Sequence, residues 1–306
     1  MVVHLPTLRQ LQYLTALADE LHFSRAADRC HVTQSTLSAG LQELETILGA
    51  ALVERTKRRV RMTPLGEDFV ARARRILTEV EDMAVMATAG KEPLAGLLRM
   101  GAIPTIGPYV LPRIMGPLRA SYPDLRLFLR EDKTPDLIAA LDGGAIDAAL
   151  IALPVDVAGL DFVTLADDPF WYAARPDHPL AGGRAPLNPE DLPTDDLILL
   201  DDGHCLRDQV LAICPDRRQA ARPGAFQATS LYTLVELVAG GFGTTLLPEI
   251  ALKSELLQGA AISVRPLAGK VGRKIALTWR RNSPRRAEYR LLAQFLRNGL
   301  AKSAAD

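Results

Sequence analysis

The spacing of apolar residues changes near residue 92, and this change limits the chain to two different kinds of folding unit. Before residue 92, apolar residues recur every three or four positions, which is typical of amphipathic helices. After it, short apolar runs alternate with helical stretches, which is typical of α/β proteins. Glu92, Pro93 and Gly96 interrupt both patterns and predict a linker. A chain of 306 residues is long enough for two or three hydrophobic cores.

Residues 1–64 are predicted to form a compact helical domain that ends in a wing-like segment. Its first helix has leucines at helical spacing, at Leu8, Leu11, Leu14 and Leu17. Ser24 is expected to cap a second helix and Thr33 a third. The full prediction is a first helix through residues 8–17, a second over residues 25–30, a turn at residues 31–33, a third from residue 34 to about 48, and a basic wing over residues 55–63.

The third helix is the candidate DNA-reading element. Leu37, Leu41, Leu44 and Leu48 fall on one stripe, which predicts the buried face. The opposite face is small and polar and can enter a major groove, where hydroxyls suit phosphates and glutamine suits adenine. Five of the seven residues 55–61 are basic and suit phosphates, although a solvated surface turn is an equal alternative. The candidate DNA contacts are Ser24, Arg25, Thr33, Gln34, Ser35, Thr36, Ser38, Gln42, Lys57, Arg58 and Arg59.

A long linker helix is predicted over residues 65–92. Its apolar residues alternate four and three positions apart, as in a coiled coil, at Phe69, Ala73, Ile76, Val80, Met83 and Ala87. This seam favours pairing with a second copy of the chain, because a DNA-binding unit gains a defined half-site spacing from dimerisation. The alternative is that the seam packs against the chain's own domain.

Residues 93–306 are predicted to form an α/β domain with parallel layers, in which ligands bind at the carboxyl ends of strands. The candidate strands are residues 97–103, 125–130, 148–152, 170–174, 197–200, 244–247 and 275–279. The candidate helices are residues 107–121, 134–143, 205–213, 230–239 and 284–300.

Composition excludes several classes of protein. Apolar residues make up 48% of the chain and charged residues 24%, so the body of the chain is not disordered. The net charge of zero argues mildly against a nucleic-acid binder, although the basic cluster counts for more. No apolar run is long enough to cross a membrane, and no signal peptide is apparent, so a cytoplasmic location is expected. We expect no cofactor and no metal, because no cysteines or histidines stand at ligand spacing.

Three cysteines occur, and two of them invite a redox interpretation. Cys205 begins a predicted helix, whose N-terminus favours the reactive thiolate. Cys214 is nine positions further, which in one helix means about 13.5 Å of rise. A disulfide needs Cα atoms within about 7 Å, so bridging requires this segment to unwind. The alternative is two packing cysteines in a core, which is also our interpretation of Cys30.

The N-terminal sequence resembles the LysR-type regulators. The resemblance lies in FSRAADRCHVTQSTLS at residues 23–38 and in residues 44–45, 48–49, 53–56 and 63–66. It implies a winged helix-turn-helix, a dimerising linker helix and a two-lobed regulatory domain like that of periplasmic binding proteins, in a homo-oligomer that is a dimer of dimers. Double-stranded promoter DNA and RNA polymerase are the implied partners, and the membrane is not one.

A second resemblance concerns the sensing segment. The sequence DGHCLRDQ at residues 202–209, with residues 103–108, 228–231 and 246–248, is similar to LysR-type activators that respond to hydrogen peroxide. The resemblance implies that Cys205 reacts with peroxide and that Cys214 resolves the product into a disulfide. It further implies a peroxide pocket formed by Thr105, Thr134, His204 and Arg273. Helix capping by Thr134 and a surface position for Arg273 are the alternatives for these two residues.

Two other functions compete with this hypothesis. A LysR-type regulator that binds a small metabolite would share the N-terminal unit but not the cysteine pair. A thiol peroxidase or cysteine hydrolase also uses a cysteine with a histidine, but it has no use for the helix-turn-helix or the basic wing. A solute-binding protein would need an export signal.

Overall fold

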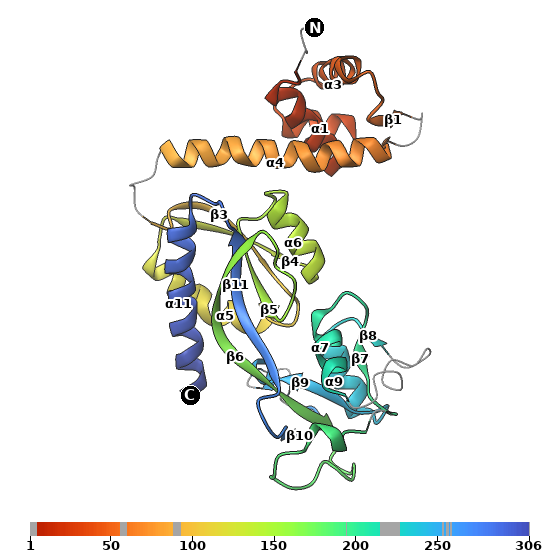
Figure 1. Cartoon of the computed structure of the whole chain (residues 1–306), viewed down its shortest axis with the longest axis vertical. Helices are drawn as coiled ribbons and strands as arrows, with labels where there is room; N and C mark the ends of the chain where they lie inside the picture. Colours follow the sequence, from red (N-terminus) through yellow and green to blue (C-terminus); the bar gives the residue numbers. More distant parts are fainter. Residues whose placement is uncertain are drawn as a thin grey trace. The chain divides into compact units, whose positions relative to one another are not determined.

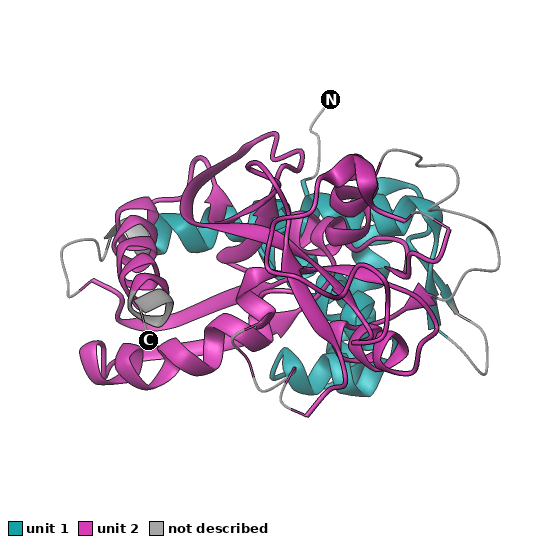
Figure 2. Cartoon of the chain, turned by 90° about the horizontal axis from the view of Figure 1, so that it is seen from below, with its two compact units in different colours: residues 1–90, 142–145 teal, residues 91–141, 146–306 magenta. Residues whose placement is uncertain are grey.

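A computed structural model describes residues 5–55, 60–87, 93–193, 195–214, 227–252, 254, 257 and 259–305. The chain divides into two compact units, which are coloured separately in Figure 2. One unit contains residues 1–90 with residues 142–145, and the other contains residues 91–141 with residues 146–306. The domain boundaries at residues 64 and 92 stay predictions.

The N-terminal unit is a winged helix-turn-helix followed by a long helix (Figure 1). Its elements are α1 (Leu8–Glu20), α2 (Phe23–Arg29), α3 (Gln34–Leu48), β1 (Val53–Arg55), β2 (Val60–Met62) and α4 (Pro64–Ala87). β1 and β2 pair antiparallel and form the wing. The predicted leucine stripe of α3 is confirmed, since Leu37, Leu41 and Leu44 are fully buried and Leu48 packs at the edge of the same core.

The start of α2 differs from the prediction. His22, not Ser24, is the N-cap, and its Nδ1 accepts a hydrogen bond from the backbone of Arg25 at 3.5 Å. Ser24 lies inside the helix, where its hydroxyl donates to Oε1 of Gln34 on α3 at 2.8 Å. Ser24 therefore connects α2 to α3 and does not cap the start of α2.

The predicted seam of α4 divides into two parts. Phe69 and Ala73 pack into the core of the N-terminal unit, as the alternative interpretation held for the whole seam. Ile76, Val80 and Met83 are 47%, 38% and 68% exposed. Among the seam residues whose burial the structure describes, these three form an uncovered apolar stripe, which a second copy of the chain can cover.

The second unit is an α/β structure. Its strands are β3 (Gly96–Ala102), β4 (Leu125–Glu131), β5 (Ala148–Leu153), β6 (Leu160–Ala174), β7 (Leu199–Leu200), β8 (Gln227–Ala228), β9 (Thr245–Pro248), β10 (Ser263–Pro266) and β11 (Gly272–Arg280). Its helices are α5 (Gly107–Ser121), α6 (Thr134–Asp142), η1 (Pro189–Asp191), α7 (Cys205–Ile213), α9 (Leu231–Ala239), α10 (Glu249–Leu252) and α11 (Arg286–Ala305). None of the helices that the structure describes is long and apolar enough to cross a membrane.

The expectation of a parallel sheet is correct only in part. The large sheet has the order β10-β6-β11-β5-β3-β4, with β9 also paired to β6, and only β4-β3-β5 are parallel. β6 and β11 run antiparallel to each other and through both halves of the unit (Figure 1). A chain that crosses to the far half and returns must place these two strands in opposite directions, which explains the mixed sheet.

Two separate hydrophobic cores define two lobes. Lobe 1 is built on β3, β5, β11, α5 and α11, and lobe 2 on β9, α7, α9 and the far end of β6. Leu160 and Leu165 of β6 belong to the first core, whereas Phe170 and Tyr172 belong to the second. Only this second part of β6 was predicted as strand, because the acidic residues Asp161, Asp167 and Asp168 mask the alternation before it. β8 and β10 were also missed.

Gly66 provides a test of the packing between the wing and α4. A Cβ atom at this position would lie 2.1 Å from the carbonyl oxygen of Leu52, which is backbone and cannot move aside cheaply. We expect Gly66→Ala to lower the free energy of unfolding by about 1–3 kcal/mol, as overpacking does. The measurement is urea denaturation of the purified chain.

Gly116 is the matched control for Gly66. It is exposed within α5, and a Cβ there would meet no atom within 4 Å. Gly116→Ala should raise the free energy of unfolding by about 0.5–1 kcal/mol, because alanine is the better helix former. Equal effects of the two substitutions would contradict the proposed packing at Gly66.

Candidate functional site

Helix α7 has a cysteine at each end. Cys205 is its first residue, and Cys214 is its C-cap. Both are thiols, with no disulfide between them. Cys205 is half-buried against the core of lobe 1, whereas Cys214 is 5% exposed and belongs to the core of lobe 2. The predicted helix, with its cysteine at the N-terminus, is confirmed, and the two sulfurs lie in different hydrophobic environments.

Two faces of α7 contact the two lobes. Gln209, four residues after Cys205 and so on the same face, donates from Nε2 to the carbonyl oxygen of Ala152 in β5 at 3.4 Å. Leu206 and Val210 lie on another face and are buried in lobe 2 with Cys214. The helix is therefore held by both cores while it stays helical.

The loop before α7 is fixed by charges. The Nζ of Lys133 donates to Oδ2 of Asp201 at 2.8 Å and to the carbonyl oxygen of Asp202 at 2.6 Å. Hydrogen bonding to Lys133 lowers the pKa of Asp201. Nε of Arg207 lies 3.0 Å from Oδ1 of Asp202, and its Nη1 donates to the carbonyl oxygen of Leu200.

His204 is a buried imidazole at the N-cap position of α7. Its side chain makes no capping hydrogen bond, and its Nε2 lies 3.0 Å from Oδ1 of Asp201 without hydrogen-bond alignment. Burial lowers the pKa of His204, and the charge of Lys133 lowers it further, while the charge of Asp201 opposes both. The balance favours the neutral imidazole at neutral pH.

Arg273 is fully buried, so its interpretation as a surface charge is wrong. Its Nε donates to Oδ2 of Asp168 at 2.8 Å, and its two other nitrogens donate to Oγ1 and the carbonyl oxygen of Thr105 at 2.8 and 2.9 Å. Asp168 also accepts from the backbone of Ile250 at 2.9 Å. The network joins β6 and β11 to the loop before α5, where the two lobes meet.

Thr134 is the first residue of α6 and is buried, at 2% exposure. Its hydroxyl has no hydrogen-bond partner among the described residues, so the structure does not support its interpretation as a capping group. Oε1 of Gln209 is a second buried oxygen without a partner in this part of the chain. Buried polar atoms without a hydrogen-bond partner are uncommon in proteins. Such atoms are therefore candidates for bonding a small polar ligand.

The structure connects some of the expected pocket residues but not all. Thr105 and Arg273 are hydrogen bonded, and His204 adjoins Cys205 in the chain. No hydrogen bond between described residues links Thr105 or Arg273 to the other three, which are Thr134, His204 and Cys205. Sequence reasoning missed Lys133, Asp168, Asp201 and Gln209. A signal was available for Lys133 and Asp201, since each directly precedes a segment singled out for sensing.

The candidate DNA-reading face begins at Thr33, which is the N-cap of α3 as predicted. Its hydroxyl accepts from the backbone of Thr36 at 3.2 Å and lies 2.9 Å from that of Ser35. The face that α3 exposes includes Gln34, Ser35, Thr36 and Gln42, while Ser38 is half-buried.

The other candidate DNA contacts are placed less favourably or not at all. Arg25 is exposed but bonded to Glu20, with Nε 3.3 Å from Oε2 of that carboxylate. Lys57, Arg58 and Arg59 lie outside the described residues. Arg61 on β2 is exposed beside them in the chain.

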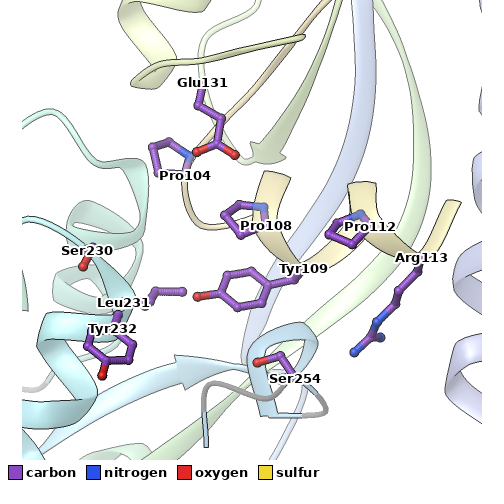
Figure 3. A pocket seen from close by; sticks show the side chains of 10 residues that line it. All are labelled: Pro104, Pro108, Tyr109, Pro112, Arg113, Glu131, Ser230, Leu231, Tyr232 and Ser254. Carbon is purple, nitrogen blue, oxygen red and sulfur yellow. The ribbon is translucent and has the colours of Figure 1, made fainter. Parts of the chain in front are cut away.

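A cavity of about 690 Å³ lies in the second unit (Figure 3). Tyr109 and three prolines of α5 and its preceding loop form one wall, and the start of α9 forms another. Glu131 and Ser230 supply polar groups. The cavity has the size of a small-molecule site, but none of the predicted peroxide-pocket residues lines it.

Two family models match the chain. The model described as "Bacterial regulatory helix-turn-helix protein, lysR family" matches residues 8–67, and the "LysR substrate binding domain" matches residues 91–301. Among curated relatives, a "Hydrogen peroxide-inducible genes activator" of Dickeya chrysanthemi is 41% identical, over 95% of this chain and 94% of the relative. The "HTH-type transcriptional regulator EstR" of Acinetobacter baylyi is 38% identical, over 96% of this chain and 97% of the relative.

Solved structures of similar proteins agree with the fold. A cysteine-to-aspartate variant of full-length OxyR from Pseudomonas aeruginosa has a TM-score of 0.79 and 39% identity, covering 96% of this chain and 98% of its own. A hydrogen-peroxide-bound cysteine-to-serine mutant of OxyR from Corynebacterium glutamicum has a TM-score of 0.62 and 35% identity, covering 99% and 96%.

The lowered pKa of His204 predicts a pH dependence of stability. Below the ordinary histidine pKa of 6.5, the unfolded chain binds a proton at His204 that the folded chain resists. Stability from this residue is therefore present above pH 6.5 and falls as the pH drops below it. We expect His204→Gln to flatten this fall, measured by urea denaturation between pH 5 and 8. An unchanged fall in the variant would assign it to another group.

Proposed function

The chain belongs to the LysR family of bacterial transcriptional regulators, and from this premise we propose that it is an OxyR-like regulator that senses hydrogen peroxide. The N-terminal unit binds promoter DNA, and Cys205 in the second unit reacts with the peroxide. One observation carries the proposal: a thiol at the start of α7 has a second thiol at the other end of the helix, in a different core.

The proposed chemistry begins at the sulfur of Cys205. The thiolate attacks one oxygen of hydrogen peroxide, the O–O bond breaks, and Cys205 becomes a sulfenic acid while the departing hydroxide takes a proton to form water. The thiol of Cys214 then attacks the Cys205 sulfur, and the S–O bond breaks as a second water leaves. The two cysteines lose two electrons, and one peroxide becomes two waters.

Four residues form the proposed peroxide pocket with Cys205. The hydroxyl of Thr134, which has no hydrogen-bond partner in the described part of the chain, is available to bond a peroxide oxygen. Arg273 and Thr105, held by Asp168, supply a buried positive charge and a hydroxyl. The neutral imidazole of His204 can accept or donate one proton.

Disulfide formation changes the structure of α7. The Cα atoms at its two ends are about 13.5 Å apart along an ideal helix, and a disulfide requires less than about 7 Å. Closure therefore unwinds the helix, separates Gln209 from Ala152 and disturbs the core that holds Cys214. We propose that this local remodelling is the signal that alters transcription of antioxidant genes.

The remaining parts of the proposal concern assembly and location. Ile76, Val80 and Met83 on α4 are the surface for pairing with a second copy, within a dimer of dimers. RNA polymerase is the expected partner at the promoter, and the cytoplasm the expected site of action. The protein acts as a regulator and not as an enzyme, since each peroxide is consumed in changing its own state.

A second candidate function is regulation by a small metabolite. The cavity of about 690 Å³, which has the size of a small-molecule site, favours it. Under this alternative, the cysteine pair would be packing residues. The two functions differ in whether peroxide alone alters the protein.

Cysteine variants separate these candidates. Cys205→Ser should abolish the response of transcription to peroxide while DNA binding remains, and Cys214→Ser should stop oxidation at the sulfenic acid. The measurement is mass spectrometry of alkylated thiols after a short peroxide pulse, with a promoter footprint alongside. Cys30→Ser is the matched control and should respond like the parent protein. Induction by peroxide in Cys205→Ser would refute the proposed sensor.

Substitutions in the DNA-binding unit separate phosphate contacts from base contacts. Replacing Arg58 and Arg59 with alanine should weaken binding to all sequences and reduce the slope of log affinity against log salt by about 2. Gln42→Ala should weaken binding to the promoter by about 1–3 kcal/mol and leave the affinity for unrelated DNA unchanged. Fluorescence anisotropy over a salt series measures both. A slope unchanged by the double substitution would remove the wing from the interface.

A further inference from the structure

The ammonium group of Lys133 connects the loop before α7 to lobe 1. Lys133 lies directly before α6 in lobe 1, and its carbonyl oxygen accepts a hydrogen bond from the backbone of Leu137 in that helix. Its Nζ reaches across to Asp201 and Asp202, at 2.8 and 2.6 Å. These two residues stand four and three positions before Cys205 in the chain. We call these contacts the Lys133 bridge.

The backbone of the loop is shaped to admit the bridge. Gly203 has a φ of +88°, a conformation that residues with a Cβ adopt at a cost. A Cβ at Gly203 would lie 3.0 Å from Cδ of Lys133, so the lysine stem passes close over the glycine. The side chains of Lys133 and Asp201 are 33% and 31% exposed, so water weakens the pair without removing it.

We propose that Lys133 is a positioning residue that holds the start of α7 against lobe 1 and slows closure of the Cys205–Cys214 disulfide. This inference rests on the function proposed above. In closure, the thiol of Cys214 attacks the sulfenic sulfur of Cys205, and water leaves as the S–S bond forms. A loop anchored to lobe 1 at Asp201 and Asp202 restrains Cys205 from leaving that lobe. The Lys133 bridge therefore stabilises the reduced arrangement, in which α7 is helical, relative to the arrangement that contains the Cys205–Cys214 disulfide.

The electrostatics of His204 provide an independent sign of the same contact. Lys133 and Asp201 act on the His204 pKa in opposite directions, and the ammonium lowers it. Removing the charge of Lys133 should therefore raise the His204 pKa, whereas Lys133→Arg, which keeps the charge, should leave it unchanged. NMR titration of the imidazole measures this change, with His204→Gln to assign the signal.

The test compares the parent protein with three full-length variants that each carry one substitution. Lys133→Met keeps the stem over Gly203 and removes the charge, whereas Lys133→Arg keeps a charge. Lys274→Met is the matched control, because Lys274 makes a bond of the same 2.8 Å length to Asp167 on an exposed part of the sheet. Rapid quench with alkylation and mass spectrometry follows the sulfenic acid and the disulfide in each protein.

Lys133→Met should close the disulfide about fivefold faster than the parent, the effect expected of a partly exposed ion pair. Lys133→Arg and Lys274→Met should close at the parent rate. Closure of Lys133→Met at the parent rate, with sulfenic acid still formed at Cys205, would overturn the bridge and leave the proposed function intact. Absence of any sulfenic acid at Cys205 in the parent would overturn the function itself.

Salt gives a second test that needs no variant. Screening weakens the Lys133–Asp201 attraction, so closure in the parent protein should accelerate between low and high ionic strength. If Lys133→Met fails to fold by circular dichroism, a closure rate in the parent that does not change with salt overturns the proposal.

Discussion

Helix α7 belongs to two hydrophobic cores at once, and the behaviour of the second unit depends on this constraint. Cys205 and Gln209 face lobe 1, while Val210 and Cys214 are buried in lobe 2. A helix held in this way keeps its two thiols apart as long as both cores are intact. The residues that stabilise the reduced fold therefore set the free energy that the proposed disulfide would need to unwind the helix.

The buried Arg273–Asp168 pair has a comparable place at the crossing of the lobes. A buried ion pair is costly unless every donor is satisfied, and here the guanidinium bonds Asp168 and both oxygens of Thr105. Removing any one partner would leave a charge or a donor unsatisfied in the interior. This network fixes β6, β11 and the loop before α5 in one arrangement.

Sequence patterns predicted what depends on local chemistry. The three helices of the DNA-binding unit, the thiol at the start of α7 and the cap at Thr33 follow from spacing and side-chain type. The mixed sheet could not be predicted, because the direction of β6 and β11 depends on how the chain crosses between lobes. Asp168 was missed for a similar reason, because its partner Arg273 is 105 residues away in the chain. The place of Lys133 directly before Thr134 was a signal, but its partner 68 residues away was not predictable.

The uncovered stripe on α4 has a consequence for how the stability of the protein depends on its concentration. If a second copy covers Ile76, Val80 and Met83, folding and association share one equilibrium, and the melting temperature rises with the concentration of the chain. A regulator present in few copies per cell would then be least stable when it is scarcest. Its residence on DNA, which brings two copies together, would supply the stability that free subunits lack.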